Sequence, residues 1–185
     1  MNDRTRVQPV EGAPARIMTW AALVIVLAED AVYFLFRGQG AFAPDIYTVP
    51  FIEVYMLVMA ALLMSSLMRL PNQAWRSPLR AGGAGGLLVL GIIAAFSIGL
   101  PLILAGVLAT GAAVRTLKGP FWAPAGLSGA AAAVASVALL VAGFEVTERI
   151  IECPAAGNIG GGGSGFVTGP YHYECVDGRL SFHSG

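Results

Sequence analysis

Long apolar stretches without charged residues constrain this chain more than any other feature. The longest, residues 81–114, contains 34 consecutive uncharged residues. A bilayer core about 30 Å thick is crossed by roughly 20 apolar residues in a helix. Because backbone polar groups must be satisfied internally within lipid, such stretches fold as helices. The sequence therefore predicts an all-α polytopic membrane protein.

Composition agrees with this class and excludes others. Apolar residues make up 56% of the 185 residues, and charged residues only 12%, against about 25% in a typical soluble domain. The 11 basic and 11 acidic residues balance each other, so the chain lacks the positive charge typical of nucleic-acid-binding proteins. We expect the lipid bilayer as its surroundings and no nucleic-acid partner.

The number of spans depends on how residues 81–114 are divided. Three other spans are predicted at residues 17–36, 51–68 and 125–146. As a single helix, the 34 residues would rise about 51 Å, well beyond one bilayer. Gly99 permits a turn in the middle, and Pro101 suits the start of a new helix. We expect short spans at 83–98 and 101–115, making five; the alternative is one kinked helix, making four.

Basic residues favour five spans, because Lys and Arg in short loops remain cytoplasmic. Five spans bring to one side the basic residues of the N-terminal segment and of two loops: Arg4, Arg6, Arg16, Arg69, Arg76, Arg80, Arg115 and Lys118. This arrangement predicts a cytoplasmic N-terminus and an extracytoplasmic C-terminus. Ten arginines against a single lysine indicate a bacterial source, and hence the plasma (inner) membrane.

Three regions follow from this topology. Residues 1–16 form a cytoplasmic segment, 17–147 a transmembrane bundle and 148–185 an extracytoplasmic tail. The tail contains both cysteines, Cys153 and Cys175, on either side of a glycine-rich segment expected to be a flexible linker. In an oxidising compartment these cysteines should form a disulfide, which stabilises a loop of this length by about 3 kcal/mol.

The end of the tail is predicted to form a β-hairpin. Alternating residues flank Asp177-Gly178, which favours a type I′ turn. Pairing Val176 with Arg179 sets the register and predicts these opposed pairs: Tyr173 with Phe182, Cys175 with Leu180, His172 with His183, and Glu174 near Ser181. His172, His183 and Glu174 would share a face, which is either a weak zinc or copper site or simply solvated. No cofactor is predicted.

Carboxylates within the predicted spans are the main candidates for a site. Glu29 and Asp30 lie about 10 Å below the outer end of the first span, and Asp30, Tyr33 and Arg37 share one helix face. The candidate polar cluster comprises Glu29, Asp30, Tyr33, Arg37, Glu53 and Glu145. It is either a cation or proton site or a set of polar contacts, including Arg149, that holds helices or a partner together.

Small residues recur every fourth position in the last three predicted spans. The stripes are Gly91, Ala95 and Gly99; Ala105, Ala109 and Ala113; and Ala125, Gly129 and Ala133. Such faces let helices approach closely, within one chain, in a homo-oligomer or against a protein partner.

The spans contain no histidine, and the chain lacks Gly-x-Ser-x-Gly, His-Glu-x-x-His and Cys-x-x-Cys motifs. We therefore expect that this chain is not an enzyme. The sequence favours an interaction or accessory subunit of a membrane complex; the alternative is a small transporter or cation/proton-site protein using the outer carboxylates.

Overall fold

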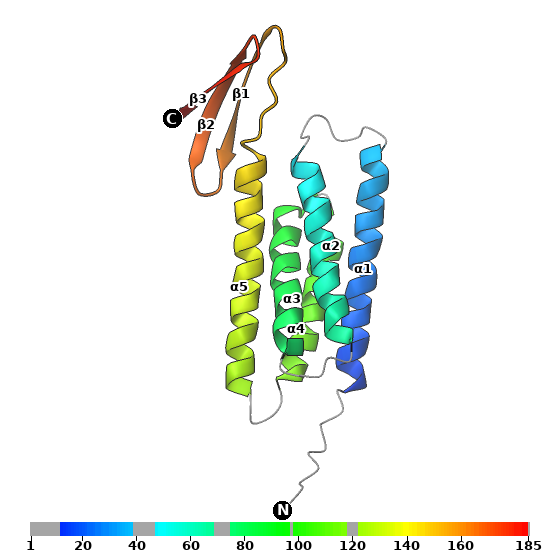
Figure 1. Ribbon diagram of the computed structural model, residues 1–185. Helices are drawn as coiled ribbons and strands as arrows, with labels where there is room; N and C mark the ends of the chain where they lie inside the picture. Colours follow the sequence, from blue (N-terminus) through cyan, green and yellow to red (C-terminus); the bar gives the residue numbers. More distant parts are fainter. Residues whose placement is uncertain (1–11, 39–46, 69–74, 97, 118–121, 185) are drawn as a thin grey trace, which may run out of the picture.

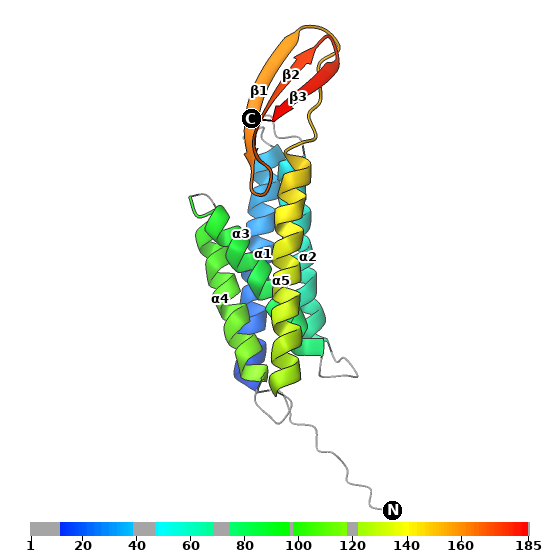
Figure 2. The ribbon, with the colours of Figure 1, turned by 90° about the vertical axis from the view of Figure 1, so that its left-hand side faces the viewer.

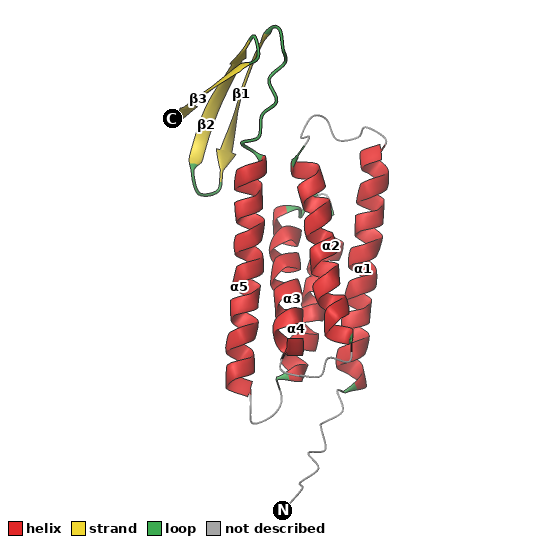
Figure 3. Ribbon diagram, viewed as in Figure 1, coloured by secondary structure: helices red, strands yellow, loops and turns green. Residues whose placement is uncertain are grey.

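In the part of the chain that the structure describes, five helices run up and down along a common direction, and a small sheet lies at one end of them (Figure 1, Figure 3). The computed structural model describes residues 12–38, 47–68, 75–96, 98–117 and 122–184, without the side chains at 37, 38, 122, 123 and 184. The helices are α1 (Ala13–Gly38), α2 (Thr48–Leu67), α3 (Arg76–Ile93), α4 (Gly99–Thr116) and α5 (Trp122–Thr147).

Each helix carries a proline within its first three residues: Pro14, Pro50, Pro78, Pro101 and Pro124. Proline lacks an amide proton, and the first helical turn has no intrahelical acceptor for one. The separation of α3 from α4 before Pro101 is confirmed, so the single kinked helix is wrong. The predicted bounds of α3 are also wrong, because this helix begins at Arg76 and ends at Ile93, rather than running from 83 to 98.

Four helices, α1, α2, α4 and α5, are long and apolar enough to cross a membrane. Two arginines, Arg76 and Arg80, and five glycines lower the hydropathy of α3. Length and composition therefore support a membrane-embedded protein with four candidate spans among the described residues, and the fifth predicted span is not confirmed. At the sheet end of the bundle, the last turn of α3 and the first turn of α4 lie lower than the ends of α1 and α5 (Figure 2).

Glycines let the central helix, α3, pack closely against its neighbours. It contacts α2, α4 and α5, while α1 packs against α2 and α4. Gly82 and Gly85 face Ala132 and Ala133 of α5, and Gly83 and Gly86 face Leu63, Tyr55 and Met59 of α2. The Tyr55 hydroxyl donates a hydrogen bond to the Ser136 carbonyl oxygen at 2.9 Å, which links α2 to α5.

The predicted small-residue stripe of α4 lies inside the bundle: Ala105 and Ala109 are fully buried, and Ala113 nearly so. On α5, Gly129 faces Ala81 of α3. Gly91 of α3 faces Ile103 of α4. These described stripe residues pack against other helices of the same chain.

Four helical arginines lie at the end opposite the sheet, here named the basic end: Arg16, Arg76, Arg80 and Arg115. The predicted gathering at one end is confirmed for these four, while Arg4, Arg6, Arg69 and Lys118 lie outside the described residues. Arg80 is fully buried. Its Nε donates to Ser66 Oγ at 3.3 Å, and the Ser66 hydroxyl donates to the Leu63 carbonyl oxygen at 2.7 Å. Arg80 therefore ties α3 to α2.

The tail folds as an antiparallel sheet in the order β1 (Asn158–Gly165), β2 (Gly169–Val176), β3 (Arg179–Ser184). Asp177 and Gly178 have φ of 46° and 77°, as a type I′ turn requires. The predicted hairpin register is confirmed in these pairs: Val176 with Arg179, Cys175 with Leu180, Glu174 with Ser181, Tyr173 with Phe182, and His172 with His183.

The glycine-rich segment forms β1, so its prediction as a flexible linker is wrong. It pairs with β2 along its whole length. A Cβ at Gly161 or Gly163 would lie 2.5 Å from the hydroxyl oxygen of Tyr173 or Tyr171, respectively. The rings of β2 thus extend across the glycines of β1, an arrangement known to compensate for glycine in an edge strand. Glycine has little intrinsic preference for strands, so pairing with β2 holds β1 in the sheet.

We predict that Gly86→Ala destabilises the bundle by about 1–3 kcal/mol, as overpacking of a tight core does. A Cβ at 86 would overlap the Tyr55 hydroxyl and lie 2.5 Å from Met59 Sδ, and both side chains are buried. Thermal unfolding in detergent measures the effect. Gly126→Ala is the matched control, because a Cβ there meets nothing within 4 Å; equal melting temperatures would contradict the packing argument.

Candidate functional site

Acidic residues gather at the sheet end of the bundle, but they form two separate groups. Asp30 of α1 lies near enough to Glu53 of α2 for their charges to interact unfavourably. Asp30 Oδ1 is buried and has no hydrogen-bond partner among the described residues. Glu29 is half-buried and Tyr33 buried on the same helix. The predicted Arg37 side chain lies outside the described residues.

The second group is built around Glu145, whose carboxylate binds the β1–β2 turn rather than joining Asp30 and Glu53. Its two oxygens accept hydrogen bonds from the amides of Val167 and Thr168 at 3.3 and 3.1 Å, and the Thr168 hydroxyl also donates to it. Arg149 Nη2 lies 3.9 Å from Glu145 Oε1. The expected pairing of Glu145 with Arg149 is therefore present, and the hydrogen bonds of its carboxylate go to the β1–β2 turn.

A glycine makes this approach possible, because a Cβ at Gly165 would overlap Glu145 Oε1. Charged side chains near lipid are costly unless their polar atoms are satisfied. Glu145 meets this requirement with donors supplied by the sheet. The carboxylate thus serves as the attachment point of the turn.

Three further contacts attach the sheet and the segment that leads to it. The Phe144 and Phe166 rings lie 6.2 Å apart, and the Tyr171 hydroxyl donates to the Glu148 carbonyl oxygen at 2.7 Å. The Tyr47 hydroxyl donates to the Glu152 carboxylate, which raises the pKa of Tyr47 above its ordinary value. These contacts join residues far apart in the chain, so no local sequence pattern predicts them.

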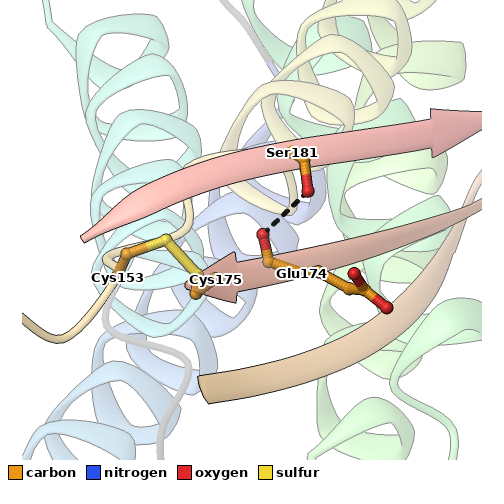
Figure 4. The surroundings of a disulfide bond; sticks show 4 residues. All are labelled: Cys153, Glu174, Cys175 and Ser181. Carbon is orange, nitrogen blue, oxygen red and sulfur yellow. Dashed lines mark hydrogen bonds between the residues drawn. A yellow bond between two sulfur atoms is a disulfide. The ribbon is translucent and has the colours of Figure 1, made fainter. Parts of the chain in front are cut away.

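The predicted disulfide is present: Cys153 is bonded to Cys175, 22 positions later in the sequence (Figure 4). It joins the segment after α5 to the middle strand, and Cys175 is buried. At the β2–β3 turn, the amide of Gly157 donates to Asp177 Oδ1 at 3.2 Å, and the Asp177 amide donates to the Gly157 carbonyl oxygen at 3.2 Å. Both ends of the sheet are therefore fixed.

One face of the sheet is apolar. Side chains alternate along a strand, and the register places five on the same face as Cys175: Ile159, Tyr171, Tyr173, Leu180 and Phe182. We name these residues the apolar sheet face. Ile159, Leu180 and Phe182 are 53%, 38% and 48% exposed. These three apolar side chains are therefore accessible at the surface of the sheet.

The opposite face carries the residues considered for metal binding. His172 pairs directly with His183, while Glu174 pairs with Ser181, whose hydroxyl donates to the Glu174 carbonyl oxygen at 3.2 Å (Figure 4). Across the described ranges, no group of three or more His, Cys, Asp or Glu side chains is placed to hold a metal ion. The geometry gives the weak zinc or copper candidate no support.

Comparisons with protein families, with curated proteins and with solved structures find no match to this chain.

We predict that Glu145→Ala loosens the β1–β2 turn. The amides of Val167 and Thr168 lose their acceptor, so their hydrogen exchange should become faster while the disulfide remains intact. Hydrogen–deuterium exchange in detergent measures this change. Glu174→Ala is the matched control, because it removes an exposed carboxylate of β2 that does not contact the turn. Unchanged exchange in the Glu145 variant would show that the carboxylate does not hold the sheet.

Proposed function

We propose that this protein is a non-catalytic interaction, or accessory, subunit of a membrane complex, and that its partner binds the apolar sheet face. The observation that carries this proposal is the exposure of Ile159, Leu180 and Phe182 on one face of an extramembrane sheet. Polar residues such as Arg179 and His183 lie on the opposite face of the same strand.

The way the sheet is held supports the same role. The Cys153–Cys175 disulfide, the Glu145 carboxylate and the Tyr171 hydroxyl all restrict its movement relative to α5. A surface that is already ordered loses less conformational entropy when it binds. The rigid attachment therefore favours recognition of a partner of fixed shape.

We further propose five membrane crossings in a bacterial plasma membrane, with the N-terminus cytoplasmic and the sheet extracytoplasmic. The 18 residues of α3 rise about 27 Å, close to a bilayer core. Arg80 of α3 is buried against α2, so the neighbouring helix shields this polar side chain from lipid. The arginines at the basic end favour a cytoplasmic location for that end, and the disulfide favours an oxidising compartment for the sheet.

A second candidate function is a cation or proton site between α1 and α2. Asp30 and Glu53 lie close together there, and one Asp30 oxygen is buried; Glu29 is adjacent in the sequence. Intramembrane carboxylates commonly mark ion paths. This candidate is weaker, because Glu145, predicted to belong to the same cluster, binds the β1–β2 turn instead.

For the orientation, we predict that a membrane-impermeant maleimide labels Cys153 and Cys175 in intact cells only after reduction. The sheet would then be outside, and the disulfide formed there. Mass spectrometry of the purified chain reads the labelling. A chain that needs permeabilisation, but no reduction, before labelling would place the sheet in the cytoplasm and reverse the proposed orientation.

For the function, we predict that a photoreactive amino acid at position 182 yields a discrete cross-linked product with another protein in cells. The same residue at 183 should yield none, because His183 is the matched exposed neighbour on the opposite face. Asp30→Asn combined with Glu53→Gln should leave this product unchanged. No product at 182, together with loss of ion-dependent uptake into proteoliposomes in the double variant, would favour the ion site.

A further inference from the structure

An apolar groove lies between α4 and α5, with α3 as its floor. Both α4 and α5 pack against α3, and a space of about 300 Å³ lies among the three helices. Its lining includes Ser77 and Leu88 of α3, Val114 of α4, and Gly126 and Ala130 of α5. Much of the lining consists of alanine and glycine, whose small side chains leave the space unfilled.

The groove has the length of one bilayer leaflet. From Ser77 to Leu88 the floor helix rises about 16 Å, which is half of a bilayer core about 30 Å thick. Ser77 lies in the first turn of α3, and Gly126 lies in the second turn of α5. Both positions belong to the basic end. The groove therefore runs from that end to about the middle of the membrane.

The length and the lining of the groove favour a lipid chain as its occupant. An α-helix with its side chains is about 10 Å across. A flexible acyl chain is thinner and of suitable length. The almost entirely apolar lining also matches hydrocarbon, since Ser77 and Thr110 are its only hydroxyl-bearing residues.

Charge at the mouth indicates the headgroup. Arg115 follows Val114 of the groove wall in the last turn of α4, and its side chain is exposed. Arg76 precedes Ser77 at the same end. Basic side chains at a membrane surface attract anionic lipids by about 1 kcal/mol each. A phosphate above the groove would therefore meet positive charge.

We propose that this groove binds one acyl chain of an anionic phospholipid from the leaflet at the basic end, with the headgroup next to Arg115. The site rests on the proposed membrane embedding, but it does not depend on the partner of the apolar sheet face. The bound lipid would fill the gap between α4 and α5 as a structural lipid, whereas the lipids around the bundle exchange with the rest of the bilayer.

The test fills the groove from α5. Gly126→Leu with Ala130→Leu places two side chains one turn apart in the groove, and a Cβ at Gly126 meets nothing within 4 Å. The matched control is Ala131→Leu with Ala135→Leu, two exposed positions of α5 outside the lining. Native mass spectrometry in detergent, with added phosphatidylglycerol, counts the retained lipid.

We expect wild type and control to retain one phosphatidylglycerol per chain, and the filled variant to bind it at least about tenfold more weakly. Arg115→Gln should reduce the preference for phosphatidylglycerol over phosphatidylcholine. Equal retention by the filled variant would overturn the site. Loss of self-association in that variant, without any lipid retained by wild type, would instead assign the groove to a helix.

A second measurement uses the unmodified chain, so it stands even if the filled variant folds poorly. Phosphatidylglycerol with a photoreactive acyl chain should cross-link to residues 110–117 and 126–133. Cross-links spread evenly over the exposed side of α1 would overturn the proposal. Phe182→Ser should retain lipid as wild type does, so failure of the partner hypothesis can be distinguished from failure of the lipid site.

Discussion

Close backbone contact between α3 and its neighbours is the interaction on which the rest of this structure depends. Two pairs of glycines, Gly82 with Gly85 and Gly83 with Gly86, point to α5 and α2. Within lipid, helices associate through close packing and polar contacts rather than through the hydrophobic effect. Glycine makes the close packing possible, and the Tyr55 and Arg80 hydrogen bonds add the polar contacts. The position of α5, and hence of the sheet attached to it, follows from this packing.

The end of α5 shows how one acidic residue can be assigned a structural role by its surroundings. Glu145 lies in the last turn of an apolar helix, where an unsatisfied carboxylate would be costly. The β1–β2 turn supplies two amides and a hydroxyl, so the charge is satisfied and the sheet is attached by the same contact. Asp30 has a different environment, with Glu53 as its charged neighbour. These two acidic residues therefore have different surroundings at the same end of the bundle.

Much of this fold could be predicted from local signals. The Asp177-Gly178 turn and its alternating flanks gave the complete β2–β3 register, because a type I′ turn fixes which residues face each other. Pro101 located the division between α3 and α4. The same signal at Pro78 would have placed the start of α3 correctly, because proline belongs to the first turn of a helix. The disulfide followed from a pair of cysteines in one short tail.

The remaining features arise from contacts that the sequence does not encode locally. A run of glycines has no strand preference of its own, and β1 forms because the rings of Tyr171 and Tyr173 extend across it. In the same way, no pattern near Glu145 indicates that its partner is Thr168, 23 residues away. The groove between α4 and α5 depends on how three helices are arranged around each other, which hydropathy alone does not specify.

The central place of α3 has a consequence for the order of assembly. Ribosomes make α3 before α4 and α5, which provide two of its three contact faces. Of these three neighbours only α2 precedes α3 in the chain, and it supplies the contacts of Ser66 with Arg80 and of Leu63 with Gly83. These contacts can therefore form before those with α4 and α5. The glycines that face α5 remain uncovered until the last helix has been inserted, so the centre of this bundle is among the last parts to be completed.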